Sequence, residues 1–473
     1  MEEATRRLGE EKVSRLLWQF SLPSIIGTLA SSVYIIIDRI FVGQVVGADA
    51  LAGMSITMPI SFIILAFGLL VGVGTGALVS IRLGQGKKEE AEHILGQAFS
   101  LVLIISVIVS GLLLYFLDPL LILFGASPAI IPYARDFIGI ILFASFFQYT
   151  GFGLSNVIRA EGNPKKAMYV VLINAGTNIV LDVFFILLFG WGVRGAAIAT
   201  VISQGVSAVI VLMHFRSPRS TLKLKFANMR LRTDLIWGIV SIGMAPFAMQ
   251  LAASVVNSLF NQNLAHYGGD PAIGAFGVIG AIANFLILPV IGVNMGAQPI
   301  IGFNYGARRY DRVVETLKDA IIAATIITTA GFALLELFPH QMLAVFTNDT
   351  SIIEIGTHGM RLLILMFPVV GFQIVGGNLF QAIGKGRLAL LLALLRQVVI
   401  LIPALMILPR FWQLNGIWIS APIADGLATV ITLLILLPEI RWLRSQSDGG
   451  KSPDEGSVPN QVPTSVLSPE RKT

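Results

Sequence analysis

The sequence contains an internal repeat. The motif Gly-Val-Gly-Thr-Gly-Ala at 72–77 returns 220 residues later as Gly-Val-Asn-Met-Gly-Ala at 292–297. At an offset of 222, Asn156, Ala160 and Gly162 recur as Asn378, Ala382 and Gly384. Self-similarity at a fixed and long offset indicates that the chain is built from two copies of one fold.

The composition excludes a soluble globular protein. Charged residues make up 13% of the chain and hydrophobic residues 55%, whereas soluble domains are typically about 25% charged. A helix needs roughly 20 apolar residues to cross a bilayer. Twelve spans are predicted: 15–42, 52–81, 92–117, 133–158, 167–189, 193–214, 235–264, 272–302, 317–338, 353–383, 388–409 and 415–438.

The distribution of basic residues predicts the orientation. If the N-terminus is cytoplasmic, all but five of the 33 Lys and Arg residues fall on the cytoplasmic side. The five exceptions are Arg39, Arg135, Arg194, Arg361 and Arg410. The positive-inside rule therefore predicts a multi-pass protein of the plasma (inner) membrane with both termini cytoplasmic. Because the basic charge reflects topology, no nucleic-acid partner is expected.

A polar linker at 216–234 divides the spans into two sets of six. We expect an N-lobe at 15–215 and a C-lobe at 235–444, preceded by a cytoplasmic segment at 1–14 and followed by a disordered tail at 445–473. Six is even, so both sets enter the membrane in the same direction. The predicted fold is an all-α membrane protein with two six-helix lobes in a parallel repeat, as in secondary transporters.

Acidic residues are scarce within the spans, and Asp38 and Asp182 stand out. A charge at membrane depth costs about 2.5–3.5 kcal/mol on insertion scales, so such residues usually face an interior or a water-filled cavity. Counted from the nearest turns at about 1.5 Å per residue, Asp38, Asp182 and Thr200 lie at a similar depth. Three spans therefore present oxygen atoms at one level.

Each of the two acids shares a helix face with a hydrogen-bonding neighbour. Tyr34 lies four residues before Asp38, and Asn178 lies four before Asp182. Together with Thr200 they suit a proton or a hard monovalent cation, and two adjacent carboxylates cannot both ionise cheaply. The alternative is a buried polar network that only fixes these helices to one another.

The second half keeps the scaffold and lacks both acids. On the repeat offsets Asp38 falls near Asn261 and Asp182 on Ala404, so cation coupling is predicted in the N-lobe. Asp425 lies in the last span at nearly the depth of Arg396 in the span before it. These two residues are expected to form a structural ion pair; the alternative for Asp425 is a second ion site.

Polar and methionine side chains within the spans are candidates for a substrate cavity. Methionine adapts to varied ligands, which favours a bulky apolar or amphipathic substrate over a small sugar. The candidate cavity residues are Asn156, Met54, Met58, Gln250, Asn257, Asn261, Met295 and Gln373.

Other classes of site are not indicated. The glycine motif at 72–76 is followed by no Walker-type lysine, so it favours helix packing over nucleotide binding. The five histidines lack zinc-ligand spacing, and no nucleophile–base pair is apparent. An enzyme is not expected, and the one cofactor considered is a sodium ion.

Taken together, several motifs resemble the multidrug and toxic compound extrusion (MATE) family over residues 14–444. They are Leu22-Pro23, Asp38, the turn at 47–52, the glycines at 72–76 and 84–86, the Arg-Ala-Glu-Gly-Asn-Pro segment at 159–164, and Asn178 with Asp182. The chain lacks the acids that NorM-type members carry in the seventh and tenth helices. It therefore looks like the prokaryotic DinF-type or MepA-like branch.

The resemblance implies a monomeric efflux transporter that works by antiport. It would export organic cations or amphipathic drugs across the lipid bilayer in exchange for protons or sodium. The family's cation site would fall on Asp38, Asn178, Asp182 and Thr200, with the carbonyl of Ala196 and with Tyr34 nearby; the first four would ligate sodium if sodium is the coupling ion. The alternatives are a lipid-linked precursor flippase of the same superfamily, an exporter of an endogenous metabolite, and a channel.

Overall fold

The computed structural model describes residues 3–448, and this part of the chain is helical without strands. The part of the predicted tail that runs from residue 449 lies outside the described residues. The N-terminal half comprises α1 (Glu3–Glu10), α2 (Val13–Val45), α3 (Ala48–Ile56), α4 (Met58–Gly84), α5 (Lys88–Tyr115), α6 (Leu117–Leu123), α7 (Ile131–Phe143), α8 (Ser145–Gln148), η1 (Tyr149–Gly153), α9 (Leu154–Ala160), α10 (Pro164–Asp182), η2 (Val183–Leu188) and α11 (Gly192–Arg216).

A short 3-10 turn, η3 (Phe226–Met229), lies in the linker before the second half begins. The second half comprises α12 (Thr233–Gly306), α13 (Tyr310–Leu337), α14 (Pro339–Ala344), α15 (Thr350–Leu363), α16 (Phe367–Ala382), α17 (Gly386–Leu394), η4 (Leu395–Leu401) and α18 (Ile402–Asp448).

The helices account for the twelve predicted spans. Eight helices are long and apolar enough to cross a membrane, and two bent pairs, 131–160 and 350–382, raise the number to ten. Two of the eight, α12 and the segment 386–447, contain a non-helical residue, Gly269 and Gln413 respectively. Since each is long enough to cross twice, the described residues hold twelve crossings.

The lobe boundaries differ from prediction by a few residues. The segment expected to precede the first span forms α1, and α2 begins at Val13. The linker is shorter than predicted, from 217 to 232, because α11 continues to Arg216 and α12 begins at Thr233. Residues 445–448, assigned to the tail, continue α18 as helix.

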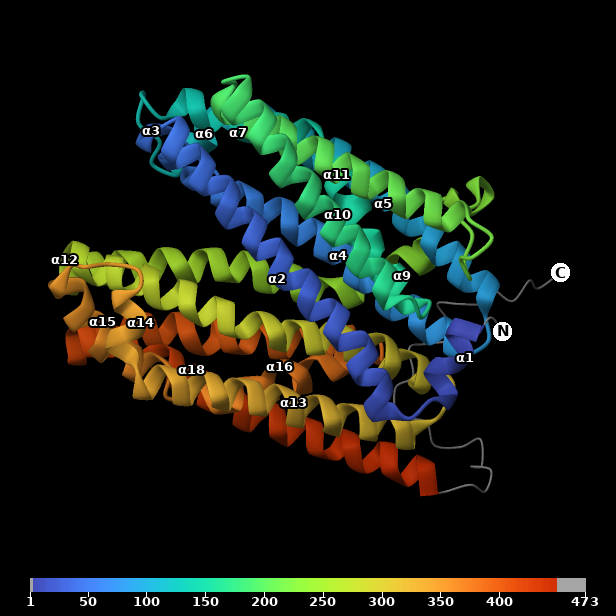
Figure 1. The fold of residues 1–473 in the computed structure, drawn as a ribbon. Helices are drawn as coiled ribbons and strands as arrows, with labels where there is room; N and C mark the ends of the chain where they lie inside the picture. The colour runs from blue at the N-terminus through green and yellow to red at the C-terminus, as the bar shows by residue number, and fades with distance from the viewer. Residues whose placement is uncertain (1–2, 449–473) are drawn as a thin grey trace.

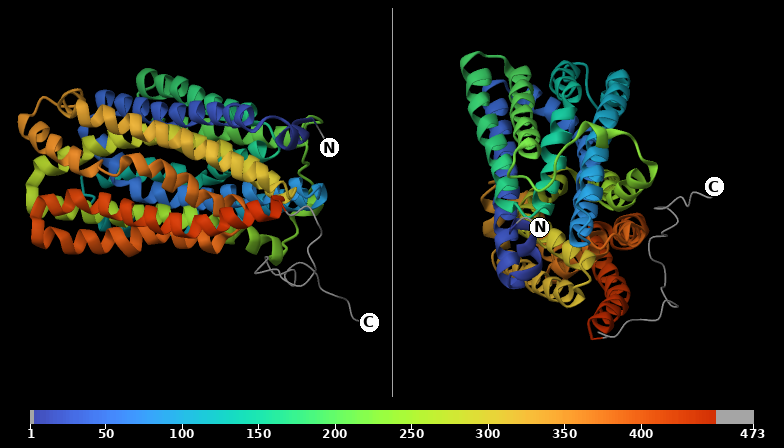
Figure 2. Two further views of the ribbon diagram at one scale, coloured as in Figure 1. Left: turned by 90° about the horizontal axis from the view of Figure 1, so that it is seen from below. Right: turned by 90° about the vertical axis from the view of Figure 1, so that its right-hand side faces the viewer.

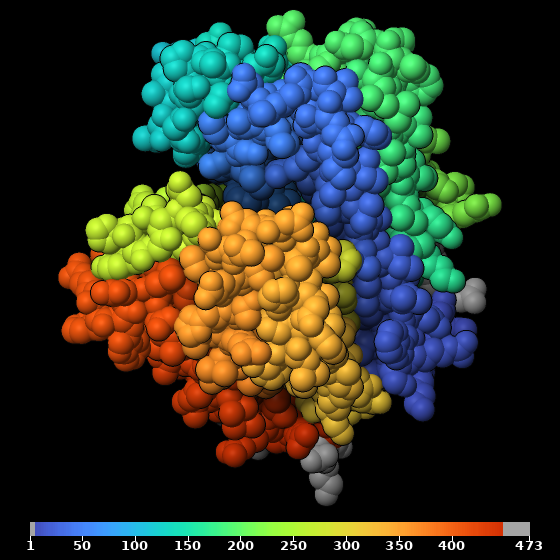
Figure 3. All heavy atoms as spheres, turned by 60° about the vertical axis from the view of Figure 1, so that its left-hand side comes forward, coloured from blue at the N-terminus to red at the C-terminus, as the bar shows by residue number. Residues whose placement is uncertain are grey.

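The two lobes form a V. In Figure 1, α1 and the end of α18 lie at one end of the molecule, which we call the terminal end, and the lobes diverge toward the other, or open, end, where α3, α6 and α15 lie. The two groups of helices can also be followed in the views of Figure 2. The space-filling view in Figure 3, with the open end brought forward, shows a hollow between them.

The lobes meet where α12 packs against α4 and α2. Glycine allows this approach: a Cβ atom added at Gly74 of α4 would lie 2.1 Å from the Ile239 carbonyl oxygen, and one added at Gly243 of α12 would lie 1.8 Å from that of Leu70. Only backbone fits in these gaps, so the helices are in direct contact. Glycines of α4 and α12 therefore line the inter-lobe seam, which closes the terminal end of the V.

Candidate functional site

Three helices of the N-lobe bring the predicted acids together. Helix α10 packs against both α2, which carries Asp38, and α11, which carries Thr200. Asp38 is 7% exposed and Asp182 is 0% exposed. Tyr34 lies one turn before Asp38 on α2, and Asp182 lies on α10, the helix that packs against α2. The structure thus places Tyr34, Asp38 and Asp182 in one cluster.

Neutral oxygen atoms complete this cluster. Asn178 is fully buried, and its Nδ2 donates to Thr200 Oγ1 over 3.4 Å. Ala196 is buried one turn before Thr200 on α11. Asp182 is the last α-helical residue before the π-helical turn η2. Such turns within a helix frequently occur at functional sites.

Four side-chain oxygen atoms in the cluster have no hydrogen-bond partner in the described structure. Asp38 Oδ1, Asn178 Oδ1 and both carboxylate oxygens of Asp182 are buried and unpaired in the described structure. Buried carboxylates are costly unless a proton or a cation neutralises them. A network that only fixes helices would pair these atoms with donors, so the arrangement is suited to binding a proton or a hard monovalent cation.

The C-lobe has a different arrangement. Arg396 Nε donates to Asp425 Oδ1 over 2.5 Å, which confirms the predicted ion pair. Asn261, which corresponds to Asp38 in the repeat, is exposed on α12. The Asp425 carboxylate forms a salt bridge with a cation, whereas neither acid of the N-lobe forms one within residues 3–448.

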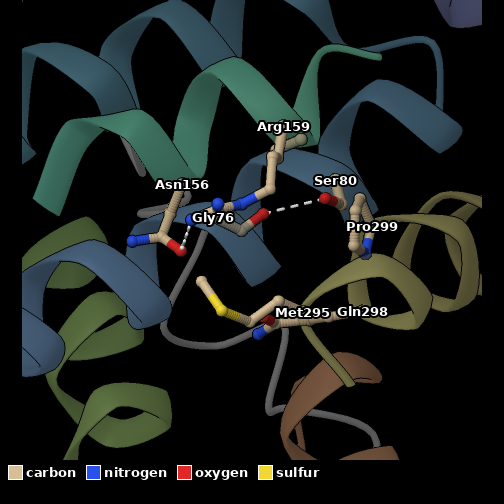
Figure 4. Close-up of a pocket in the computed structure, with 8 residues that line it drawn as sticks. Gly76, Ser80, Asn156, Arg159, Met295, Gln298 and Pro299 are labelled. Carbon is tan, nitrogen blue, oxygen red and sulfur yellow. Dashed lines mark hydrogen bonds between the residues drawn. The ribbon is translucent and has the colours of Figure 1, made fainter. Parts of the chain in front are cut away.

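The predicted cavity residues are dispersed. Asn156 and Met295 line one small cavity at the seam, together with Gly76, Ser80 and Gln298 (Figure 4). Partial or full exposure is seen for Met58, Gln250, Asn257, Asn261 and Gln373.

Met54 does not face a cavity, contrary to the prediction. Its side chain is 4% exposed and belongs to the hydrophobic core of the N-lobe. The predicted span 52–81 is broken at Thr57 into α3 and α4. Met54 was a candidate by residue type alone, and residue type does not distinguish a methionine packed in the core from one that lines a cavity.

The sequence analysis missed a buried polar network at the terminal end. Glu161 is fully buried; its Oε1 contacts His214 Nε2, and its Oε2 accepts from Ser220 Oγ over 2.9 Å and from the Leu222 backbone N–H over 3.2 Å. These contacts fasten the linker to the N-lobe. The buried position of an acid beside a histidine 53 residues away has no signature in the local sequence.

Comparisons with known proteins agree with the fold. The sequence model of the MatE family matches residues 23–184 and again 246–407, which confirms the internal repeat. The multidrug export protein MepA of Staphylococcus aureus is 28% identical over 90% of this chain and 93% of its own length.

Two solved structures have closely similar folds. The MATE multidrug transporter DinF-BH, solved in complex with R6G, is 37% identical, with a TM-score of 0.87 over 95% of this chain and 100% of its own. A MATE transporter of the MOP superfamily in an outward-facing conformation is 25% identical, with a TM-score of 0.88 over 94% of this chain and 99% of its own. The repeat, the fold and the family match lead to one conclusion: the chain belongs to the MatE family of multidrug efflux transporters.

Proposed function

We propose that this transporter exports amphipathic or cationic small molecules across the plasma membrane by antiport, with a proton or a sodium ion entering at Asp38 and Asp182. The observation that carries this proposal is the group of four buried, unpaired oxygen atoms on Asp38, Asn178 and Asp182. A cation from one side of the membrane would satisfy them, and the substrate would use the hollow between the lobes.

The termini face the cytoplasm in this proposal. The linker, the turn at 85–88 and the turn at 307–309 are rich in Lys and Arg and lie at the terminal end, which agrees with the positive-inside rule. The V then opens outward, and the seam of α4 and α12 separates the hollow from the cytoplasm.

The antiport follows from two states of the two lobes. A ligand shifts a conformational equilibrium only by its differential affinity for the two states. Cation entry at Asp38 and Asp182 from outside favours the state that has released the substrate. The return step, with substrate bound from the cytoplasm, requires the cation to leave.

The test is export from proteoliposomes in which the pH gradient and the sodium gradient are set independently. With ethidium as substrate, Asp38→Asn and Asp182→Asn should each abolish gradient-driven export while the amount of folded protein stays unchanged. Asp118→Asn is the matched control, because Asp118 pairs with Arg135 on the exposed surface, and it should export normally. Full export by either Asp38→Asn or Asp182→Asn would contradict the proposal.

A further inference from the structure

The seam between the lobes contains two small cavities at the level of α9. One is lined by Asn156, Arg159, Met295 and Gln298 and has a volume of about 10 Å³. The other is lined by Arg159, Met295 and side chains of α2 and α10 and has a volume of about 30 Å³. Spaces of this size hold no more than about one to three water molecules, so any larger ligand enters only when the seam opens.

Arg159 is the residue that both cavities share, and it is a buried cation without an acidic partner. It is 6% exposed, and within residues 3–448 its one side-chain hydrogen bond runs from Nη2 to Asn156 Oδ1 over 2.9 Å. Arg396, by contrast, is paired with Asp425. A buried charge is costly unless it is paired, so the guanidinium of Arg159 has unused capacity to bind an anion.

The opposite wall of the first cavity offers a second free donor. Gln298 Nε2 of α12 is buried and has no hydrogen-bond partner in the described structure. Figure 4 shows Arg159 on the N-lobe side of this cavity, with Met295 and Gln298 on the C-lobe side. Both lobes therefore present N–H groups to one space that contains no carboxylate.

The hydroxyl groups nearby do not supply the missing acceptors. Ser80 donates to the Gly76 carbonyl oxygen over 2.8 Å, and Ser24 of the second cavity donates to that of Phe20 over 2.9 Å. Neither hydroxyl bonds to Arg159. Among the residues that line the two cavities, the N–H donors of Arg159 and Gln298 thus remain free, and free N–H donors are the groups that recognise an oxyanion.

We propose that Arg159 and Gln298 bind the oxyanion, a carboxylate or a phosphate, of an amphipathic ligand as the lobes part at the seam. The guanidinium group matches either oxyanion with two parallel N–H donors, and the thioether of Met295 packs against the apolar body. The inference rests on the proposed export function and extends its substrates from organic cations to zwitterions and anions.

The test compares two dyes that differ at one group. Rhodamine 19 carries a free carboxylate, and rhodamine 6G is its ethyl ester, so their ratio of affinities reports the oxyanion contact alone. Binding to the purified full-length protein is measured by fluorescence polarisation in detergent. Arg159→Gln should weaken binding of the acid about tenfold and of the ester less than twofold, because a charge-assisted hydrogen bond is lost. Arg159→Lys keeps the positive charge but loses the two parallel N–H donors. Its affinity for rhodamine 19 should therefore lie between those of the unmodified protein and of Arg159→Gln.

Two further variants make the test independent of folding. Gln298→Ala should weaken binding of rhodamine 19 about threefold more than binding of rhodamine 6G. This prediction can be checked even if Arg159→Gln does not fold. Arg82→Gln is the matched control: Arg82 also lies at the terminal end, where it pairs with Glu90 over 3.1 Å, and its loss should leave the ratio unchanged. The inference would be overturned if the Arg159 and Gln298 variants bound both dyes equally more weakly, or bound both as tightly as the unmodified protein.

Two arms separate the possible sources of the oxyanion. In the first arm, short-chain phosphatidylglycerol is added to the unmodified protein with rhodamine 19 bound. If the lipid displaces the dye, the site binds phospholipid headgroups as well as small molecules. If it does not, the site is specific to the small molecule. In the second arm, gradient-driven export of both dyes is measured. If neither dye is exported, the proposed export function is wrong. The affinity ratio needs no gradient, so the two failures are distinguishable.

Discussion

Gly84 of the N-lobe and Gly306 of the C-lobe pack reciprocally against each other's helix. A Cβ atom at Gly84 would lie 1.9 Å from the Phe303 carbonyl oxygen, and one at Gly306 would lie 2.1 Å from that of Ile81. The two residues are 222 positions apart, at the offset of the internal repeat. The duplicated glycines thus join the two lobes at the terminal end.

We expect Gly84→Ala to shift the protein toward the state that is open at the terminal end. The methyl group overlaps the backbone of α12, and overpacking costs about 1–3 kcal/mol, which corresponds to roughly a 5- to 150-fold change in the equilibrium. Because the chain contains no cysteine, Lys87→Cys and Asp311→Cys can carry spin labels that report the separation of the lobes. Gly280→Ala is the control, since nothing lies within 4 Å of its Cβ position. An unchanged distance distribution in Gly84→Ala would contradict the role of the seam.

Asp425→Asn should reduce stability more than it reduces transport. Loss of one partner of a buried ion pair costs about 3–5 kcal/mol, and the lower end applies because 30% of the Arg396 side chain is exposed. The readout is thermal unfolding in detergent beside transport per folded molecule. Asp118→Asn, which breaks an exposed pair, should cost less than about 1 kcal/mol. Normal stability together with lost transport would make Asp425 a second functional acid.

The sequence predicts the acids of the site because membrane burial makes them rare. Two acids deep in apolar spans, each with a polar residue four positions earlier, identify Asp38 and Asp182 without a structure. The depth argument also identifies the partner of Asp425, since Arg396 is the cation at the matching level. These predictions depend only on depth counted along a helix, which the π-helical segments η2 and η4 change little.

The other features of the structure depend on tertiary packing, which the sequence pattern does not show. Met54 was a candidate by residue type alone, and only the packing of the neighbouring helices shows that it lies in the core of the N-lobe. Arg159 belongs to a family motif, but its lack of an acidic partner is visible only when the neighbouring helices are in place. The partners of Glu161 lie on α11 and in the linker, so no local pattern reveals them.

Glu161→Gln should loosen the linker. Glu161 accepts hydrogen bonds from Ser220 and from the backbone of Leu222, and weakening bonds to a charged acceptor costs about 2 kcal/mol. Limited trypsin digestion of the purified protein should then cleave after Lys223 and Lys225 roughly 30-fold faster. Glu315→Gln, at an exposed position of α13, serves as the control. Equal cleavage rates would show that Glu161 does not hold the linker.

Substrate and cation should compete for the unmodified protein. Because coupling between two binding sites is reciprocal, a cation that favours the substrate-releasing state must itself bind more weakly when substrate is present. We therefore expect ethidium affinity, measured on purified protein, to fall as either the proton or the sodium concentration rises, and the ion that produces the fall identifies the coupling ion. Asp38→Asn should remove the dependence, since Asp38 Oδ1 is one of the unpaired oxygen atoms that the cation would occupy. An affinity that stays flat in both titrations of the unmodified protein would exclude competition at equilibrium and place the coupling in the rates of exchange between the two states.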